Sequence, residues 1–232
     1  MELKVIAYAR NGHTDKFGIP RQSREESPIV TRIVFEPEYS VAETLRGIEG
    51  FSHLWILWGF SEVDSWSPTV RPPRLGGNKR VGVFATRSPF RPNPIGMTSV
   101  RLLEVRNKKS GSKTMELLVS GADLMDGTPI YDIKPYLSYS DSHPEAVNGF
   151  AEETKDYKLN VEMSATALLN DDALLNDAIR RDIEYILSQD PRPAYQDNPE
   201  REYKMDYAGY RITFVVEDTR AIVKKISKIT KK

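Results

Sequence analysis

The chain has 232 residues, of which 39% are hydrophobic and 28% charged, and its 33 Lys and Arg residues balance 33 Asp and Glu residues. It contains no cysteine, which excludes disulfides, thiolate metal sites, cysteine nucleophiles and iron–sulfur clusters. No apolar run is long enough to span a membrane, and the charged first ten residues lead into no signal-peptide pattern. We therefore expect a globular, cytoplasmic protein with no membrane span, and the scattered histidines predict no metal site.

The first 140 residues read as short strands separated by turns rich in glycine and proline. The predicted strands cover residues 3–9, 29–35, 53–60, 81–85, 98–105 and 114–120, with one short helix at 41–46. Several short strands spaced in this way indicate a barrel or a sandwich. We predict a mainly β protein, with a small β-barrel over residues 1–142.

Residues 143–232 form the predicted second domain, a smaller α+β extension. A polar stretch at 140–158 carries turn signals and marks the connection. Leucine and isoleucine then recur at spacings of three and four from 168 to 187, which predicts helix, until Asp190-Pro191 ends the pattern. Alternation over 203–216 predicts a hairpin that turns at Ala208-Gly209, and the lysine-rich end at 220–232 is expected to be solvated and frayed.

The segment at 71–97, RPPRLGGNKRVGVFATRSPFRPNPIGM, carries the strongest functional signal. It holds six basic residues and no Asp or Glu, and six of the chain's 15 prolines fall between residues 68 and 94. Proline fixes the backbone before a ligand arrives and glycine permits close approach to it, so this composition favours a rigid binding loop over a plain connection. We predict that it binds a nucleotide-like ligand, with arginines available for phosphates or bases: Arg71, Arg74, Arg80, Arg87 and Arg91.

Three shorter segments are chemically distinctive but ambiguous. Asp123, Asp126 and Asp132 lie around a Gly-Thr-Pro turn and either accept hydrogen bonds from a ligand or make Asx-turns. The loop at 16–22, KFGIPRQ, combines cations with an amide beside a proline. At 190–195, DPRPAY holds an acid, an arginine and a phenol near two prolines, and the same residues also read as a helix stop.

Taken in chain order, KFGIPRQ, FSHLWIL, RPPRLGGNKRVGVFATRSPFRPNPIGM, DLMDGTPIYDIKPY and DPRPAY strongly resemble the TrmO family, also called TsaA-like or YaeB-like, over nearly the whole chain. The resemblance implies a TsaA-like β-barrel, usually a homodimer, that uses S-adenosylmethionine to methylate N6 of N6-threonylcarbamoyladenosine at tRNA position 37. The sequence lacks a strand followed by a GxGxxG loop and a helix, so it gives no support to the doubly wound methyltransferase fold.

The resemblance also implies which residues bind the methyl donor. Matched motif by motif, they are Pro20, Arg21, Gln22, Ser61, Glu62, Arg87, Met97, Asp123, Leu124, Met125 and Asp126. Ser61 departs from the family pattern, because family members often have histidine at this position. We expect the tRNA phosphates or the threonyl carboxylate to be held by Arg71, Arg74, Arg80, Arg91, Lys134 and Arg192.

The proton that leaves N6 needs an acceptor. Because N6 of the modified base is conjugated to a urea-like carbonyl, a modest acceptor suffices, and we expect Asp126, or Asp190 with Tyr195, to play this part. Two alternatives remain at this stage. One is a non-catalytic RNA-binding barrel whose aspartates only shape turns, and the other is a hydrolase that uses paired aspartates and a metal.

Overall fold

The computed structural model describes residues 2–20, 22–72, 79–107, 114–164, 176–192, 196 and 198–229. These residues divide into two compact units. Apart from the segment Gly12–Pro20, the described residues up to 147 form the first unit, and Gly12–Pro20 joins the residues from 148 onward in the second. The predicted domain boundary after residue 142 stays a prediction.

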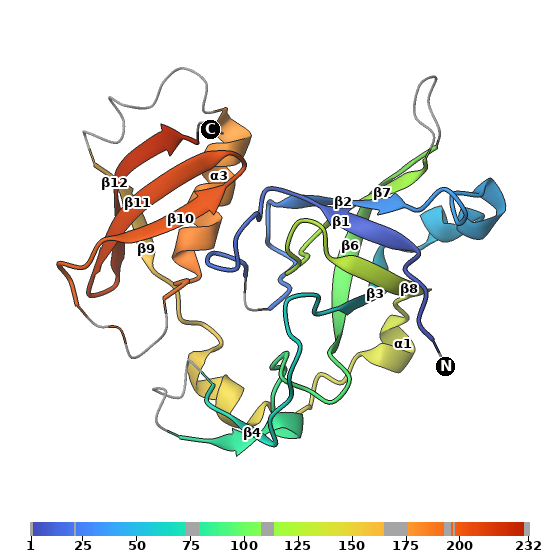
Figure 1. Ribbon diagram of the computed structural model, residues 1–232, viewed down its shortest axis with the longest axis horizontal. Helices are drawn as coiled ribbons and strands as arrows, with labels where there is room; N and C mark the ends of the chain where they lie inside the picture. The colour runs from blue at the N-terminus through green and yellow to red at the C-terminus, as the bar shows by residue number, and fades with distance from the viewer. Residues whose placement is uncertain are drawn as a thin grey trace. The chain divides into compact units, whose positions relative to one another are not determined.

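The first unit is a closed barrel of six strands (Figure 1). Around the barrel the strand order is β1-β2-β7-β6-β3-β8, and every neighbouring pair is antiparallel, including the β1–β8 pair that closes the ring. The mainly β fold and the barrel predicted from the sequence are therefore confirmed. The strands are β1 (Ala7–Arg10), β2 (Val30–Phe35), β3 (His53–Gly59), β6 (Ile95–Arg106), β7 (Glu116–Ser120) and β8 (Pro129–Pro135).

Alternation along each strand fills the barrel with apolar side chains. In β3, Leu54, Ile56 and Trp58 point inward and are buried. The intervening residues His53 and Trp55 face outward and are half-buried, as the two-residue period of a strand requires. Inward residues of the other strands complete the core, among them Ala7, Ala9, Ile33, Phe35, Val100, Leu117, Val119 and Ile130.

The antiparallel order sends three long connections out of the same end of the barrel. These are residues 11–29 between β1 and β2, 60–94 between β3 and β6, and 121–128 between β7 and β8. The middle connection contains a small sheet of β4 (Thr69–Val70) and β5 (Val81–Gly82), followed by the 3-10 helix η4 (Val83–Ala85). The sequence expectation of one strand over 81–85 was thus only half right. Two 3-10 helices, η1 (Ala42–Leu45) and η2 (Ile48–Gly50), lie in the connection from β2 to β3, which leaves from the other end.

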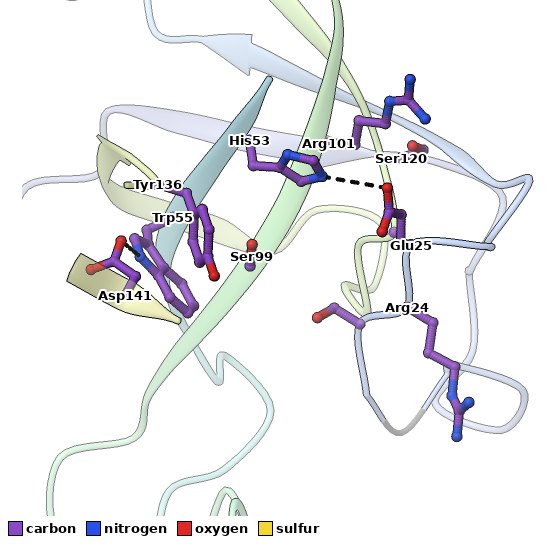
Figure 2. Close-up of a pocket in the computed structure, with 11 residues that line it drawn as sticks. Arg24, Glu25, His53, Trp55, Ser99, Arg101, Ser120, Tyr136 and Asp141 are labelled. Atoms are coloured by element: carbon purple, nitrogen blue, oxygen red, sulfur yellow. Dashed lines mark hydrogen bonds and ion pairs between the residues drawn. The ribbon is translucent and has the colours of Figure 1, made fainter. Parts of the chain in front are cut away.

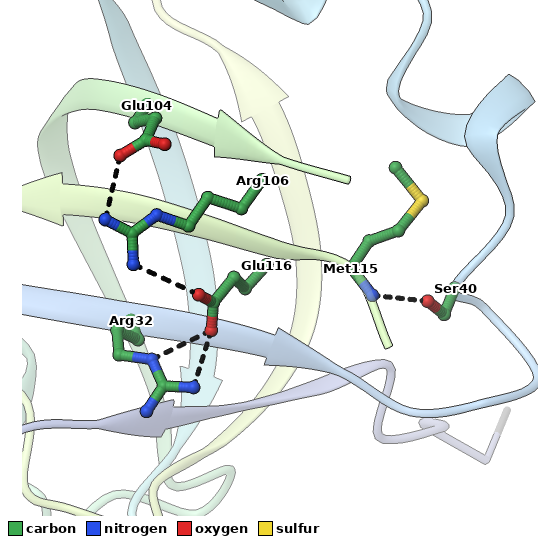
Figure 3. A network of polar contacts seen from close by, with 6 residues as sticks. All are labelled: Arg32, Ser40, Glu104, Arg106, Met115 and Glu116. Carbon is green, nitrogen blue, oxygen red and sulfur yellow. Dashed lines mark hydrogen bonds and ion pairs between the residues drawn. The ribbon is translucent and has the colours of Figure 1, made fainter. Parts of the chain in front are cut away.

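An ion-pair network ties three barrel strands together on the outer surface (Figure 3). Glu116 on β7 accepts hydrogen bonds from Arg32 on β2, with the two N···O distances at 2.8 and 2.7 Å. Its other oxygen lies 3.4 Å from Arg106 on β6, which also pairs with Glu104 at 2.9 Å. The network crosses the β2–β7 and β7–β6 seams and so supports the register of both.

In the part of the second unit that the structure describes, a four-stranded sheet lies beside the helix α3. The sheet order is β10-β11-β12-β9, antiparallel except for the β12–β9 pair. The helix packs its buried residues Ile183, Ile186 and Leu187 beside the sheet (Figure 1). Its N-cap Asn176 accepts a hydrogen bond from the backbone of Ile179 at 2.8 Å, which satisfies one of the free N–H groups of the first turn. The elements of this unit are the 3-10 helix η5 (Gly149–Thr154), β9 (Asn160–Met163), α3 (Asp177–Ser188), β10 (Tyr203–Tyr207), β11 (Tyr210–Glu217) and β12 (Arg220–Lys228). The short helix α1 (Ser138–Asp141) precedes them in the chain and belongs to the first unit.

The segment Gly12–Pro20 contributes to the core of this second unit. His13 forms a β-bridge with Tyr207, and the backbone of Ala208 donates to the carbonyl of Gly12 at 2.9 Å. Phe17 stacks against Tyr203 and Phe214 with ring centroids 6.4 and 6.3 Å away. A stretch that connects two barrel strands is therefore also a structural part of the C-terminal unit.

The C-terminal elements correct one expectation and confirm another. The hairpin predicted over 203–216 is present as β10 and β11. The segment from residue 220, expected to be frayed, instead forms β12 up to residue 228, because its apolar residues Ala221, Val223 and Ile226 are buried while its lysines stay exposed. The first half of the predicted helical region, residues 165–175, lies outside the described residues, and α3 covers its second half. Among the described helices, none is long and apolar enough to cross a membrane.

Candidate functional site

Asp123 is the most deeply placed carboxylate at the loop end of the barrel. It follows β7 and accepts a hydrogen bond from the Thr98 hydroxyl at 2.6 Å, and that hydroxyl in turn accepts one from the Trp58 indole at 3.0 Å. Although Asp123 is only half-buried as a residue, protein atoms surround its carboxyl closely enough that desolvation raises its pKa. The hydrogen bond from Thr98 and the nearby Arg87 oppose this rise. Asp123 is thus a fixed and strongly desolvated acceptor.

Arg87 and Gln22 complete a polar cluster around Asp123. The Arg87 guanidinium donates to the side-chain carbonyl of Gln22 at 2.5 Å and is close enough to Asp123 to attract its charge. The backbone of Ser23, next to Gln22, also donates to the Asp123 carboxylate. Residues from all three long loops therefore meet here: Gln22 from the first, Arg87 from the second and Asp123 from the third.

The other predicted donor residues that precede Asp123 lie on the first two loops or directly after them. Met97 lies near the start of β6, directly before Thr98, and its side chain is 60% exposed. Ser61 and Glu62 form an exposed turn directly after β3. Pro20 is buried at the end of the segment that belongs to the second unit, and Arg21 lies outside the described residues.

The remaining predicted donor residues form a tight turn between β7 and β8. Leu124 is buried in the core, so only its backbone faces polar groups, and its carbonyl accepts from the Asn11 side chain at 2.9 Å. The Met125 carbonyl accepts from the Thr128 hydroxyl at 2.8 Å. One oxygen of Asp126 accepts from the Asn11 backbone at 3.1 Å, while the other lies 3.6 Å from Arg10. Asp126 thus shapes the turn and keeps one oxygen partly exposed.

Of the predicted substrate-binding residues, some are exposed to solvent and others are already hydrogen-bonded within the protein. Arg71 is exposed, whereas Arg80 donates to the hydroxyl and the carbonyl of Thr69, each at 2.7 Å. Arg91 donates to the Thr86 carbonyl at 2.7 Å and holds the loop in shape. Lys134 on β8 pairs with Asp132 at 2.8 Å and is exposed. Arg74 lies outside the described residues.

Asp190 and Arg192 form a buried ion pair in the second unit. Arg192 donates to both carboxylate oxygens of Asp190, at 2.9 and 3.1 Å, and both side chains are nearly buried. The Tyr157 hydroxyl also donates to Asp190 at 3.3 Å, and burial raises the pKa of that phenol. Tyr195, the predicted companion of Asp190, lies outside the described residues.

Thr98 and Trp58 were missed from the sequence, although they hold Asp123 in place. Neither belongs to a distinctive motif, and both point into the barrel, where the sequence pattern predicts only core. In the structure any side chain at Gly96 would collide with the Trp58 ring, so the glycine within the strand pattern is the one sequence feature related to this packing. No group of three or more His, Cys, Asp or Glu side chains that could hold a metal ion occurs among the residues that the structure describes.

These features define a β-barrel protein with a cluster of polar side chains, the candidate ligand site, in the loops at one end of the barrel. The chain belongs to the tRNA-methyltransferase O family: the model of the family's N-terminal domain matches residues 8–142, and that of its C-terminal domain matches residues 156–229.

Individual relatives span most of the chain. The tRNA (adenine(37)-N6)-methyltransferase of Escherichia coli K12 is 42% identical over 205 residues, which are 86% of this chain and 85% of that protein. A Pseudomonas aeruginosa protein named as a putative S-adenosylmethionine-dependent methyltransferase, RcsF, is 41% identical over 87% of this chain and 86% of its own length. The crystal structure of TrmO from Pseudomonas aeruginosa has a TM-score of 0.76 at 31% identity and covers 98% of both chains.

Proposed function

We propose that this chain is a tRNA methyltransferase that transfers a methyl group from S-adenosylmethionine to N6 of adenosine 37, beside the anticodon, in its threonylcarbamoylated form. The observation that carries the proposal is the meeting of Gln22, Arg87 and the desolvated Asp123 at one end of the barrel. All three are predicted donor contacts by the resemblance of their sequence motifs to those of the family, and the chain belongs to that family. Its relatives are named for methylation of adenine 37 and for the use of S-adenosylmethionine.

The chemistry of the cluster fits S-adenosylmethionine. When bound, this co-substrate would supply an electrophilic methyl group on its sulfonium. Asp123 offers a carboxylate for hydroxyl or ammonium donors, Arg87 an exposed guanidinium for a carboxylate, and Met97 an apolar surface for a base. Because all three loops leave a closed barrel, the polar groups are held before the ligand arrives, which lowers the cost of ordering them.

Of the two predicted proton acceptors, we propose Asp126. It lies on the same loop as Asp123, in the same unit, and one of its oxygens is partly exposed beside Arg10. Asp190 already accepts from Arg192 with both oxygens. Asp126→Asn should lower kcat about a hundredfold, in the range of general-base removal, without changing the Kd for S-adenosylmethionine. An increased Kd with normal kcat would make Asp126 a donor contact instead. Glu38→Gln, on the connection from the other barrel end, is the matched control.

Mass spectrometry of nucleosides tests the reaction directly. Threonylcarbamoylated tRNA is incubated with the protein and a methyl-labelled donor, and methylated threonylcarbamoyladenosine is the expected product. No label in that nucleoside, together with no saturable heat of S-adenosylmethionine binding, would favour the alternative of a non-catalytic RNA-binding barrel. Activity on tRNA that lacks the threonylcarbamoyl group would overturn the proposed substrate.

Three further features belong to the proposal. The tRNA contacts are assigned to Arg71, Arg74, Arg80, Arg91 and Lys134, whose joint charge predicts binding that weakens as salt increases. Arg192, predicted with them from the sequence, is buried in its ion pair with Asp190 and is left out of this set. A homodimer is expected from the family resemblance, and light scattering of the purified chain tests it. A cytoplasmic location follows from the tRNA substrate.

A further inference from the structure

A pocket of about 430 Å³ opens on the outer surface of the barrel, outside the donor cluster (Figure 2). Its floor is the outward face of β3 and β6, where Trp55 lies opposite Ser99 in the strand register. Its sides are the loop at 23–25 and the start of the chain after β8. The volume lies within the usual range for small-ligand sites and is large enough for a nucleoside.

One wall of this pocket is a fixed aromatic surface. The Trp55 indole donates to the Asp141 carboxylate at 2.8 Å, and the same oxygen accepts from the Leu137 backbone at 3.0 Å. The Tyr136 ring lies against Trp55, with centroids 5.5 Å apart and planes tilted by 49°. Because the indole is anchored at its nitrogen, its ring is held in place and half-exposed. Fixed aromatic faces of this kind stack nucleobases with little ordering cost.

The other side of the pocket is polar and carries positive charge. Arg101, exposed on β6, lies opposite His53 in the register. Arg24 lies on the loop that forms the side, where its guanidinium pairs with Glu26 at 3.4 Å. Glu25 is the acid facing His53, at 3.9 Å, while the other acid of the lining, Asp141, is engaged by Trp55. Figure 2 shows the aromatic pair on one side of Ser99 and the two arginines on the other. An aromatic wall opposite guanidinium groups matches a nucleotide, which has a flat base and anionic oxygens.

The pocket and the donor cluster share their walls. Met97 of the donor set, Ser99 and Arg101 alternate on the outward face of β6, so Met97 lies about 7 Å from Ser99 along the strand. On the loop side, Ser23 of the pocket follows Gln22, and its backbone bonds Asp123. A base on Trp55 is therefore within about one base length of the donor residues.

We infer that this pocket receives the acceptor nucleoside of the tRNA, with its base on Trp55 and an anionic oxygen of the substrate on Arg101. The inference rests on the proposed function and names the surface on which its substrate is held. The anionic oxygen belongs either to a phosphate or to the threonyl carboxylate, since a guanidinium binds both in the same way.

Steady-state methylation of threonylcarbamoylated tRNA tests the base contact. Trp55→Ala should raise the KM for tRNA about tenfold to a hundredfold, the usual effect of losing one stacked base. Trp55→Phe, which keeps an aromatic face, should stay within about threefold of the wild type. The Kd for S-adenosylmethionine, measured by calorimetry, should be unchanged in both. A wild-type KM in Trp55→Ala, or an equal loss of donor affinity, would overturn the inference.

Arg101→Ala, an exposed substitution that leaves the fold intact, tests the anion contact through the affinity for anticodon stem-loop RNA. A phosphate contact predicts equal weakening for RNA with and without the threonylcarbamoyl group, and a salt slope smaller by about 0.7. A carboxylate contact predicts weakening for the modified RNA alone. Arg46→Ala, also exposed and on the connection at the other barrel end, is the matched control. Unchanged RNA affinity in Arg101→Ala would contradict the inference.

Two outcomes distinguish this inference from the proposed function and from an interface between two copies of the chain. If the wild-type chain transfers no methyl group, the proposed function fails, and the stem-loop affinities alone then decide whether the pocket binds RNA. If Trp55→Ala and Arg101→Ala instead change the mass of the protein in light scattering, the pocket is covered by a second copy of the chain, and the inference is wrong.

Discussion

Thr98 connects the interior of the barrel to its loop end through a single hydroxyl. The hydroxyl accepts from Trp58 and donates to Asp123, so the orientation of the carboxylate depends on the packing of a buried indole. A side chain that reads as core in the sequence therefore controls a polar group of the candidate site. Such positioning residues lie on strands rather than loops, where packing fixes their rotamers.

Thr98→Val should shift the pH dependence of donor binding. Burial already raises the pKa of Asp123, and the Thr98 hydrogen bond opposes that rise. Without the bond the pKa increases further, so the carboxylate is protonated, and binding is lost, at a higher pH than in the wild type. Calorimetric Kd values for S-adenosylmethionine across the acid range measure the midpoint. Thr98→Ser, which keeps the hydroxyl, should restore it, and an unchanged midpoint in Thr98→Val would show that Asp123 is not a donor contact.

His13 should make the second unit less stable in mild acid. Burial lowers the pKa of His13 to about 4, below its ordinary value of 6.5. Between these values the unfolded chain binds a proton that the folded chain does not, so the free energy of unfolding decreases as the pH falls from 6.5 to 4, by about 3 kcal/mol in total. Urea unfolding at several pH values measures this slope. His13→Phe should remove it, whereas His143→Phe, at an exposed histidine, should leave it in place.

At the level of elements, the network around Glu116 joins β2, β7 and β6 through side chains alone (Figure 3). Glu116→Gln should lower the free energy of unfolding of the barrel by about 0.5 to 1 kcal/mol, because two guanidinium groups lose their shared anion. The loss should shrink in high salt, which screens the remaining charges. Glu104→Gln, at a more exposed position on the same network, should cost less than half as much in the same denaturation experiment. Equal decreases in the free energy of unfolding for the two substitutions would mean that the network stabilises the barrel no more than a single surface ion pair does.

Strands that are short runs of apolar and β-branched residues could be predicted from the sequence, and those with charged or proline-rich stretches could not. β2 and β3 lie within one residue of their predicted bounds and β7 within two. β8 begins and ends with proline, and β12 is rich in lysine, so neither segment was predicted as a strand. Their strand character comes from the neighbours with which they pair, which a single sequence does not reveal.

The residues of the candidate site were likewise only partly predictable from the sequence. The donor residues came from a resemblance between motifs, and the antiparallel order of the barrel explains why three separate loops bring Gln22, Arg87 and Asp123 together. The outer pocket went unnoticed because its residues come from five segments, and His53 and Trp55 read as parts of a core strand. Only the strand register shows that these two side chains face outward beside Arg101 and Ser99.

At the scale of the whole molecule, the segment Gly12–Pro20 links the C-terminal unit to the donor loop. It packs Phe17 against Tyr203 and Phe214 and leads, through Pro20, directly into the predicted donor residues. Phe17→Ala should therefore weaken S-adenosylmethionine binding several-fold, although Phe17 is not a donor residue, because residues 20–22 lose their anchored end. Thr14→Ala, exposed on the same segment, is the control. Calorimetry gives the Kd, and an unchanged value in Phe17→Ala would show that the anchor is not needed.

The same segment imposes an order on synthesis. Residues 12–20 leave the ribosome among the first, but Met205, whose side chain leaves no room for a Cβ atom at Gly18, follows that glycine by 187 residues. Nascent chains stopped before residue 203 therefore hold an early segment whose binding surface does not yet exist. The last strands to be translated complete the packing of one of the first loops, so we expect the proposed donor site to form only after β10 and β11 have been made.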